Sequence, residues 1–204
     1  MNGYIQNSLK GTNHKLFFKN VDVYVLNPLP VDFNLEFVLR KVEKTVPEHL
    51  VYGLESIYIG KFDDLEEKEF DALYKDGTIY ATNEQEDEED LIDDIIHEIA
   101  HLTEENLGHY IYSDRKIIDE FLGKRVRLQA ILQAHNFEIP NQEAFYQLEY
   151  DEEFDYYLYK TIGYDRLTFL SMGLFISPYS ATSLREYFAK SFQRYFMGDM
   201  EQIQ

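Results

Sequence analysis

Three segments in the first half of the chain have the pattern of β-strands. Residues 21–27 alternate apolar and polar positions and stop at Pro28, and residues 54–60 are rich in β-branched and aromatic side chains. The dipeptide Asp76-Gly77 favours a tight turn, and residues 78–82 after it have the pattern of a third, short strand. We therefore expect a small sheet in this half of the chain.

Apolar residues at helical spacing occur once between the first two predicted strands and then throughout the second half of the chain. It predicts a helix over residues 32–47 and, later, helices from a cap at Ser113 to about Ala134, over 143–160 and over 184–197. Aromatic side chains recur at helical spacing near the start of the 143–160 segment, and we expect them to pack in the core: Tyr146, Tyr150, Phe154 and Tyr157.

The order of these elements, strands with one helix and then helices only, predicts an α+β fold. The chain contains no internal repeat and no linker-like stretch. We therefore expect residues 1–204 to form one domain, with a sheet-containing part over residues 1–110 and a helical part over residues 111–204.

The formal charge of −19 narrows the classes of partner. A protein that binds along phosphates needs basic patches, so we expect no nucleic acid and no anionic membrane surface as a partner. A basic or neutral partner is compatible with this charge. The sequence shows no signal peptide and no long apolar span, so we expect a cytoplasmic location by default, with secretion by another route left open.

The segment His97-Glu98-Ile99-Ala100-His101 places two histidines one helical turn apart with a glutamate between them. Side chains at positions i and i+4 can present two imidazole nitrogens to one zinc ion, and the glutamate can take a proton from a zinc-activated water. On a helical wheel the histidines lie almost opposite an apolar side formed by Ile92, Ile95, Ile99 and Leu102. The alternative is a surface helix with two exposed histidines.

A catalytic zinc site needs a third protein ligand, and the chain has no cysteine to supply it. The metzincin pattern fails, because Glu104 and Leu107 stand where it requires glycine and histidine. Glu120 has a suitable spacing after the second histidine, although Lys124 one turn away also explains it as a surface ion pair. Glu186 lies on the polar side of the last predicted helix. Spacing alone does not decide between the two glutamates.

The His-Glu-x-x-His motif, the distant sequence Arg-Glu-Tyr-Phe-Ala-Lys-Ser-Phe and a tyrosine seven residues before its glutamate resemble the peptidase domain of anthrax toxin lethal factor and its relatives. Those proteins are zincins whose third zinc ligand is the glutamate of a comparable helix. The resemblance implies that Glu186 joins His97 and His101 around one zinc ion. It also implies that Tyr179 hydrogen-bonds the oxyanion of the reaction.

We therefore predict a zinc-dependent endopeptidase of the zincin class, in which a small twisted sheet lies over the helix that carries the two histidines. Glu98 would act as the general base, and residues 78–82 would form the edge strand that pairs with an extended peptide or protein substrate. The acidic surface allows a preference for basic substrates. The alternative is an acidic protein that keeps the zincin fold without catalysis and binds a basic protein partner.

Overall fold

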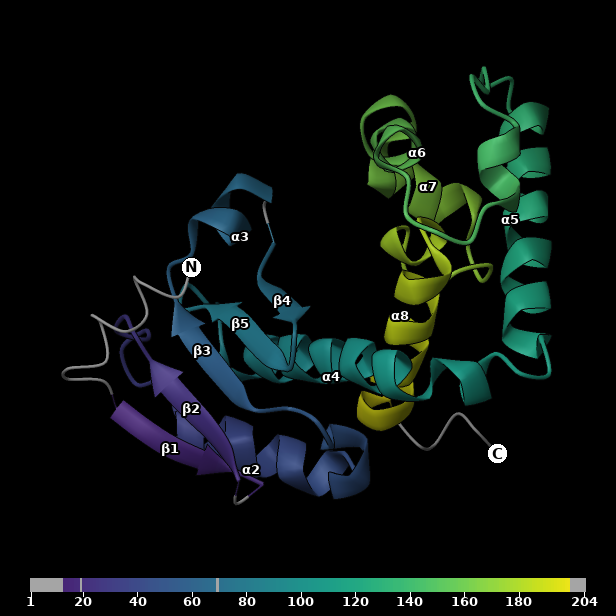
Figure 1. Cartoon of the computed structure of the whole chain (residues 1–204). Helices are drawn as coiled ribbons and strands as arrows, with labels where there is room; N and C mark the ends of the chain where they lie inside the picture. Colours follow the sequence, from purple (N-terminus) through teal and green to yellow (C-terminus); the bar gives the residue numbers. More distant parts are fainter. Residues whose placement is uncertain (1–12, 19, 69, 199–204) are drawn as a thin grey trace. The chain divides into compact units, whose positions relative to one another are not determined.

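The computed structural model describes residues 13–18, 20–68 and 70–198 of the chain (Figure 1). The chain divides into two compact units. Of the described residues, the first unit comprises those up to Thr103 together with 196–198, and the second comprises Glu104–Tyr195. All strands of the described residues belong to the first unit, and the second unit is built from helices.

The described part of the first unit contains a five-stranded mixed sheet with the order β1-β2-β3-β5-β4. Its strands are β1 (Asn13–Phe17), β2 (Val21–Val25), β3 (Ser56–Gly60), β4 (Ala72–Lys75) and β5 (Thr78–Thr82). The strands β2, β3 and β5 run parallel to one another, while β1 and β4 are antiparallel and lie at the two edges. The three predicted strands are present, and the combination of sheet and helices confirms the α+β class.

The edge strand is not the one that the sequence predicted. Residues 78–82 form β5, which lies between β3 and β4, so the edge on that side of the sheet is β4. The expected tight turn at Asp76-Gly77 is present, with positive φ at both residues, and it joins β4 to β5. The prediction missed β4 because four residues are too few to show a clear period of two.

Two helices, α2 (Leu35–Thr45) and α4 (Glu88–Ile111), lie on the same side of the sheet (Figure 1). The side chain of Asn34 caps α2 by accepting the Phe37 N–H at 3.0 Å. A short 3₁₀ turn, η1 (Glu48–Val51), follows α2. The sheet face toward these helices is apolar and buried, with Val23, Ile57, Ile59, Ile79 and Ala81 all at 0% exposure.

The other face of the sheet carries an aromatic row. The rings of Tyr24, Tyr58 and Tyr80, one from each parallel strand, stack at centroid separations of 5.0 and 5.8 Å. Phe62, which precedes the short helix α3 (Asp63–Lys68), packs edge-on against the last of them at 5.4 Å. Cross-strand aromatic pairs of this kind stabilise a sheet and help to fix its register.

The second unit is organised around the long helix α5 (Lys116–Ala134). All the elements that follow it are shorter: η2 (Glu143–Tyr146), α6 (Glu152–Tyr156), the π-helix η3 (Tyr157–Gly163), α7 (Tyr164–Leu170), η4 (Tyr179–Ala181) and α8 (Leu184–Met197). The bounds of α8 are those predicted from the sequence.

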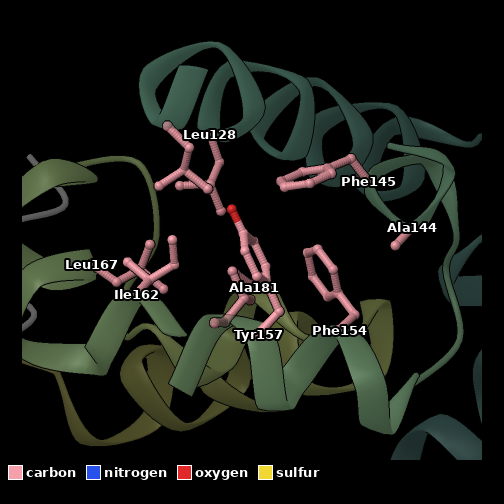
Figure 2. Close-up of a cluster of buried hydrophobic side chains, with 10 residues drawn as sticks. Leu128, Ala144, Phe145, Phe154, Tyr157, Ile162, Leu167 and Ala181 are labelled. Carbon is pink, nitrogen blue, oxygen red and sulfur yellow. The ribbon is translucent and has the colours of Figure 1, made fainter. Parts of the chain in front are cut away.

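A buried cluster joins several of these elements (Figure 2). Phe145 and Phe154 meet edge to face at 4.9 Å, and the Tyr157 hydroxyl points toward α5 near Leu128. Leu167 and Ala181 bring α7 and η4 into the same cluster. These contacts hold η4, the turn that precedes α8, against the body of the second unit.

Two sequence predictions in this unit were wrong. Ser113 does not cap α5, because its hydroxyl donates to the Tyr110 carbonyl and the helix starts after Arg115, a left-handed residue. Residues 143–160 do not form one helix, since the Asp151 side chain caps a new helix by accepting the Phe154 N–H at 2.7 Å. As a result the aromatic side chains divide: Phe154 is buried, whereas Tyr146 and Tyr150 are 58% and 48% exposed.

Within the described residues, no helix combines the length and the apolar character that crossing a membrane requires.

Candidate metal centre

The helix α4 carries the candidate centre, and its local sequence explains how it begins. The Asp87 carboxylate accepts the N–H groups of Glu89 and Asp90 at 2.9 and 3.2 Å, in the manner of an N-cap. The acidic residues of the first turn suit the positive end of the helix dipole. Apolar residues on two sides of the helix are then buried: Leu91, Ile92, Ile95, Ile96, Ile99 and Leu102.

The structure brings His97, Glu98 and His101 together on α4. One ligand atom from each residue lies within 4.8 Å of the others, and no other group of this kind occurs among the described residues. Glu98 and His101 are only 5% and 6% exposed, and His97 is half-buried. The alternative of a surface helix with two exposed histidines is therefore wrong.

The spacing of the two imidazoles fits one tetrahedral ion. The Nε2 atoms of His97 and His101 lie 3.2 Å apart, with the ring planes at 87°. Bonds of about 2.0–2.1 Å at the tetrahedral angle put two nitrogen ligands roughly 3.3 Å apart. In a metal-free protein the same separation suits a hydrogen bond between the rings. The separation of the two nitrogen atoms is therefore compatible with a shared zinc ion.

Glu98 is held by a contact that the sequence analysis missed. Its Oε2 atom accepts the main-chain N–H of Tyr74, in the edge strand β4, at 2.6 Å. A backbone amide leaves no mark in the sequence that would identify its partner. The Asp76-Gly77 turn was the one available signal, because it fixes the register of β4 against β5.

The two glutamates that compete as third ligand have different surroundings in the second unit. Glu120 accepts from the ammonium of Lys124 at 2.9 Å and from the hydroxyl of Tyr187 at 2.8 Å. These hydrogen bonds, with Lys124 first, lower the pKa of its carboxyl group. The surface ion pair predicted for Glu120 is therefore present.

Glu186 lies in the first turn of α8 and is half-buried. The Ser183 hydroxyl accepts its N–H at 3.1 Å, so Ser183 caps the helix. The Lys190 ammonium, one turn along, donates to Gln193 at 2.9 Å. Because Glu186 belongs to the second unit, its role as a ligand of the histidine pair stays a prediction.

Tyr179 opens the turn η4, which the buried Arg125 holds in place. The guanidinium of Arg125 donates to the carbonyls of Ala181 and Thr182 at 2.8 and 3.1 Å, and to that of Ala144. Burial lowers its pKa to about 10, so it remains a cation at neutral pH. This residue, which the sequence analysis did not identify, anchors the segment between Tyr179 and α8. The role of Tyr179 in catalysis also stays a prediction.

Glu104, three positions after the second histidine, has a structural role. It accepts the Tyr112 hydroxyl at 2.5 Å and lies 3.9 Å from the guanidinium of Arg185. Burial, followed by this hydrogen bond, raises the pKa of Tyr112. These contacts tie the last turns of α4 to the start of α8 within the second unit.

No protein-family model matches the chain, and neither a curated protein nor a solved structure matches it. What the structure itself establishes is a His-Glu-x-x-His cluster on a helix that can hold a metal ion.

Proposed function

We propose that this protein is a zinc-dependent endopeptidase with one zinc ion. The observation that carries the proposal is the cluster of half-buried His97 with buried Glu98 and His101 on one helix, with the two imidazole nitrogens at the spacing of a shared tetrahedral ion. A buried glutamate beside two histidines is the arrangement that zinc peptidases need for water activation.

Glu186 is the residue that we propose as third ligand, on the resemblance to the lethal factor peptidase family. Two features support it over Glu120. The helix α8 forms with the predicted bounds and presents Glu186 in its first turn. Glu120 already neutralises Lys124 and accepts from Tyr187, so recruiting it to a metal would disrupt both contacts.

Bound zinc and two residues of this chain would each have one role in the reaction. Bound zinc would supply Lewis-acid activation of water and of the scissile carbonyl. Glu98 would accept the proton of the attacking water and deliver it to the leaving amine. The Tyr179 hydroxyl would donate a hydrogen bond to the carbonyl oxygen as negative charge develops on it.

The substrate would be a peptide or protein segment in extended conformation. The edge of the sheet nearest the centre is β4, which Tyr74 connects to Glu98, so we propose that the substrate pairs with β4. With a net charge of −19, the protein is suited to segments that carry lysine or arginine.

The test is metal analysis combined with peptide cleavage. The purified protein should contain about one zinc per chain and lose its activity to a chelator. Glu98→Gln should keep the zinc and lose about 10²- to 10⁴-fold in turnover, the share of general base catalysis. Glu186→Ala should release the zinc while Glu120→Ala retains it. A Glu98→Gln variant that cleaves as fast as the wild type would reject Glu98 as the base.

The charge of −19 also favours a second candidate, an inactive zincin-fold protein that binds a basic partner. Such a protein should show no turnover, and its affinity for the partner should fall steeply with salt. If the protein cleaves any peptide and a chelator stops this cleavage, the second candidate is excluded.

A further inference from the structure

The main-chain N–H and carbonyl groups of each residue in β4 point either toward β5 or toward the open edge of the sheet. The register of β4 against β5 fixes which residues point outward. The Asp71 carbonyl accepts the Thr82 N–H at 2.8 Å, which makes these two residues a hydrogen-bonded pair. Bonded and non-bonded pairs alternate along antiparallel strands. Ala72 and Tyr74, one and three positions further on, therefore direct their N–H and carbonyl groups away from β5, toward the open edge.

Of these outward groups, the Tyr74 N–H is already engaged. It donates to Glu98 Oε2 at 2.6 Å, and both partners are buried, with Tyr74 6% and Glu98 5% exposed. A hydrogen bond from an amide to a carboxylate is among the stronger ones, because one partner is charged. The contact uses a donor that β4 would otherwise offer to another strand.

We infer that the Tyr74 amide is the positioning group for Glu98, and that Glu98 ends the stretch of β4 available to a substrate. The inference rests on the function proposed above. Glutamate has three rotatable side-chain bonds, so a carboxylate without a fixed partner samples many positions. With Oε2 held by β4, we assign Oε1 as the oxygen that exchanges the proton.

The assignment also predicts how a peptide binds. A substrate strand cannot use the Tyr74 N–H, so its main-chain bonds to β4 must come from the N–H and carbonyl of Ala72 and the carbonyl of Tyr74. The bond to be cleaved would then lie toward the Tyr74 end of the strand, beside the carboxylate. One short strand thus binds the substrate and orients the base.

Proline substitutions can separate these two roles. Proline removes one N–H and is tolerated on an edge strand where that N–H faces outward. Tyr74→Pro should lower kcat by about 10- to 100-fold relative to Tyr74→Ala, which loses the same side chain but keeps the N–H, with KM similar in the two variants. Ala72→Pro should instead raise KM and change kcat little. Both proline variants should keep their zinc.

A second test of the contact between Tyr74 and Glu98 uses the metal-free protein and does not depend on catalytic activity. Amide hydrogen exchange followed by NMR should be roughly 10- to 100-fold slower at Tyr74 than at Ala72, the range expected of one hydrogen bond to a charged group. In Glu98→Ala the Tyr74 amide should exchange as fast as that of Ala72. This measurement needs no folded proline variant.

The outcomes are distinct. Equal exchange at Tyr74 and Ala72 in the wild type, or equal kcat for Tyr74→Pro and Tyr74→Ala in an active enzyme, overturns the inference and leaves the proposed function standing. A wild-type protein without zinc and without cleavage overturns the proposed function, and with it the role given to the amide. Slow exchange at Tyr74, together with a lower kcat in Tyr74→Pro and a higher KM in Ala72→Pro, supports the inference and the proposed function.

Discussion

Two buried polar clusters in this protein contrast in how their charges are compensated. The cation of Arg125 donates to main-chain carbonyls and lies over the rings of Phe121 and Phe154, at 5.2 and 4.1 Å. In the cluster on α4, two imidazoles and a carboxylate instead converge on one another. Arg125 is stabilised by bonds within the fold, whereas the histidine pair has the geometry to accept an ion from outside. Burial of charge alone therefore does not mark a candidate metal site; convergence of ligand atoms does.

The largest effect is expected when one imidazole of the cluster on α4 is removed. His101→Ala should release the zinc and reduce turnover to background, because one protein ligand is lost. Thermal unfolding with and without added zinc checks this. Zinc at a hundred times its dissociation constant should stabilise the wild type by about 2.7 kcal/mol. The variant should show no such gain, and a gain equal to that of the wild type would contradict the assignment.

Removing the charged side chain of the other cluster, Arg125, should lower the stability of the fold. Arg125→Ala leaves a cavity and three main-chain carbonyls without their donor, and we expect a loss of about 3–5 kcal/mol in the free energy of unfolding of the second unit. Arg127→Ala, an exposed arginine on the same helix, is the control and should change stability by less than about 0.5 kcal/mol. Equal urea midpoints for the two variants would show that Arg125 is not an anchor.

A smaller effect is expected at the start of α8. Ser183→Ala removes the acceptor of the Glu186 N–H and should lower stability by about 1 kcal/mol. Ser191→Ala, in the interior of the same helix, should be neutral or slightly stabilising, because alanine is the better helix former. Urea unfolding of both variants, followed by circular dichroism, makes this comparison.

The smallest effect concerns Glu120. Lys124 and Tyr187 lower the pKa of its folded carboxyl group, so its contribution to stability is present above the unfolded pKa and is lost as pH falls through the folded one. Its side chain is 56% exposed, so Glu120→Gln should cost less than about 1 kcal/mol near pH 7. The difference from the wild type should close in acid. A difference that persists at low pH would show that the ion pair is not its source.

How much the sequence could predict depended on the length of each signal. The long apolar spacings of α2 and α8 gave correct helices, and the cluster on α4 followed from a motif of five residues. The four-residue strand β4 was missed, and with it the edge of the sheet. A side-chain cap at Asp151 divided a segment whose aromatic spacing indicated one helix.

The site itself was predicted as far as side chains on one helix can predict it. His97, Glu98 and His101 are brought together by their spacing alone, because i and i+4 share a helix face. The Tyr74 amide and the Arg125 contacts depend on register and on tertiary packing, which the order of residues does not reveal. Glu186 and Tyr179 still rest on the resemblance.

The two-residue turn between β4 and β5 has a consequence for how this protein can vary. Gly77 has φ +75°, and a Cβ there would come within 3.1 Å of the Gly53 carbonyl oxygen, so the turn tolerates little change in residue type. It tolerates even less change in length. Adding or deleting a single residue would shift β4 by one position against β5, which turns every side chain of β4 to the other face and moves the Tyr74 amide away from the carboxylate on α4.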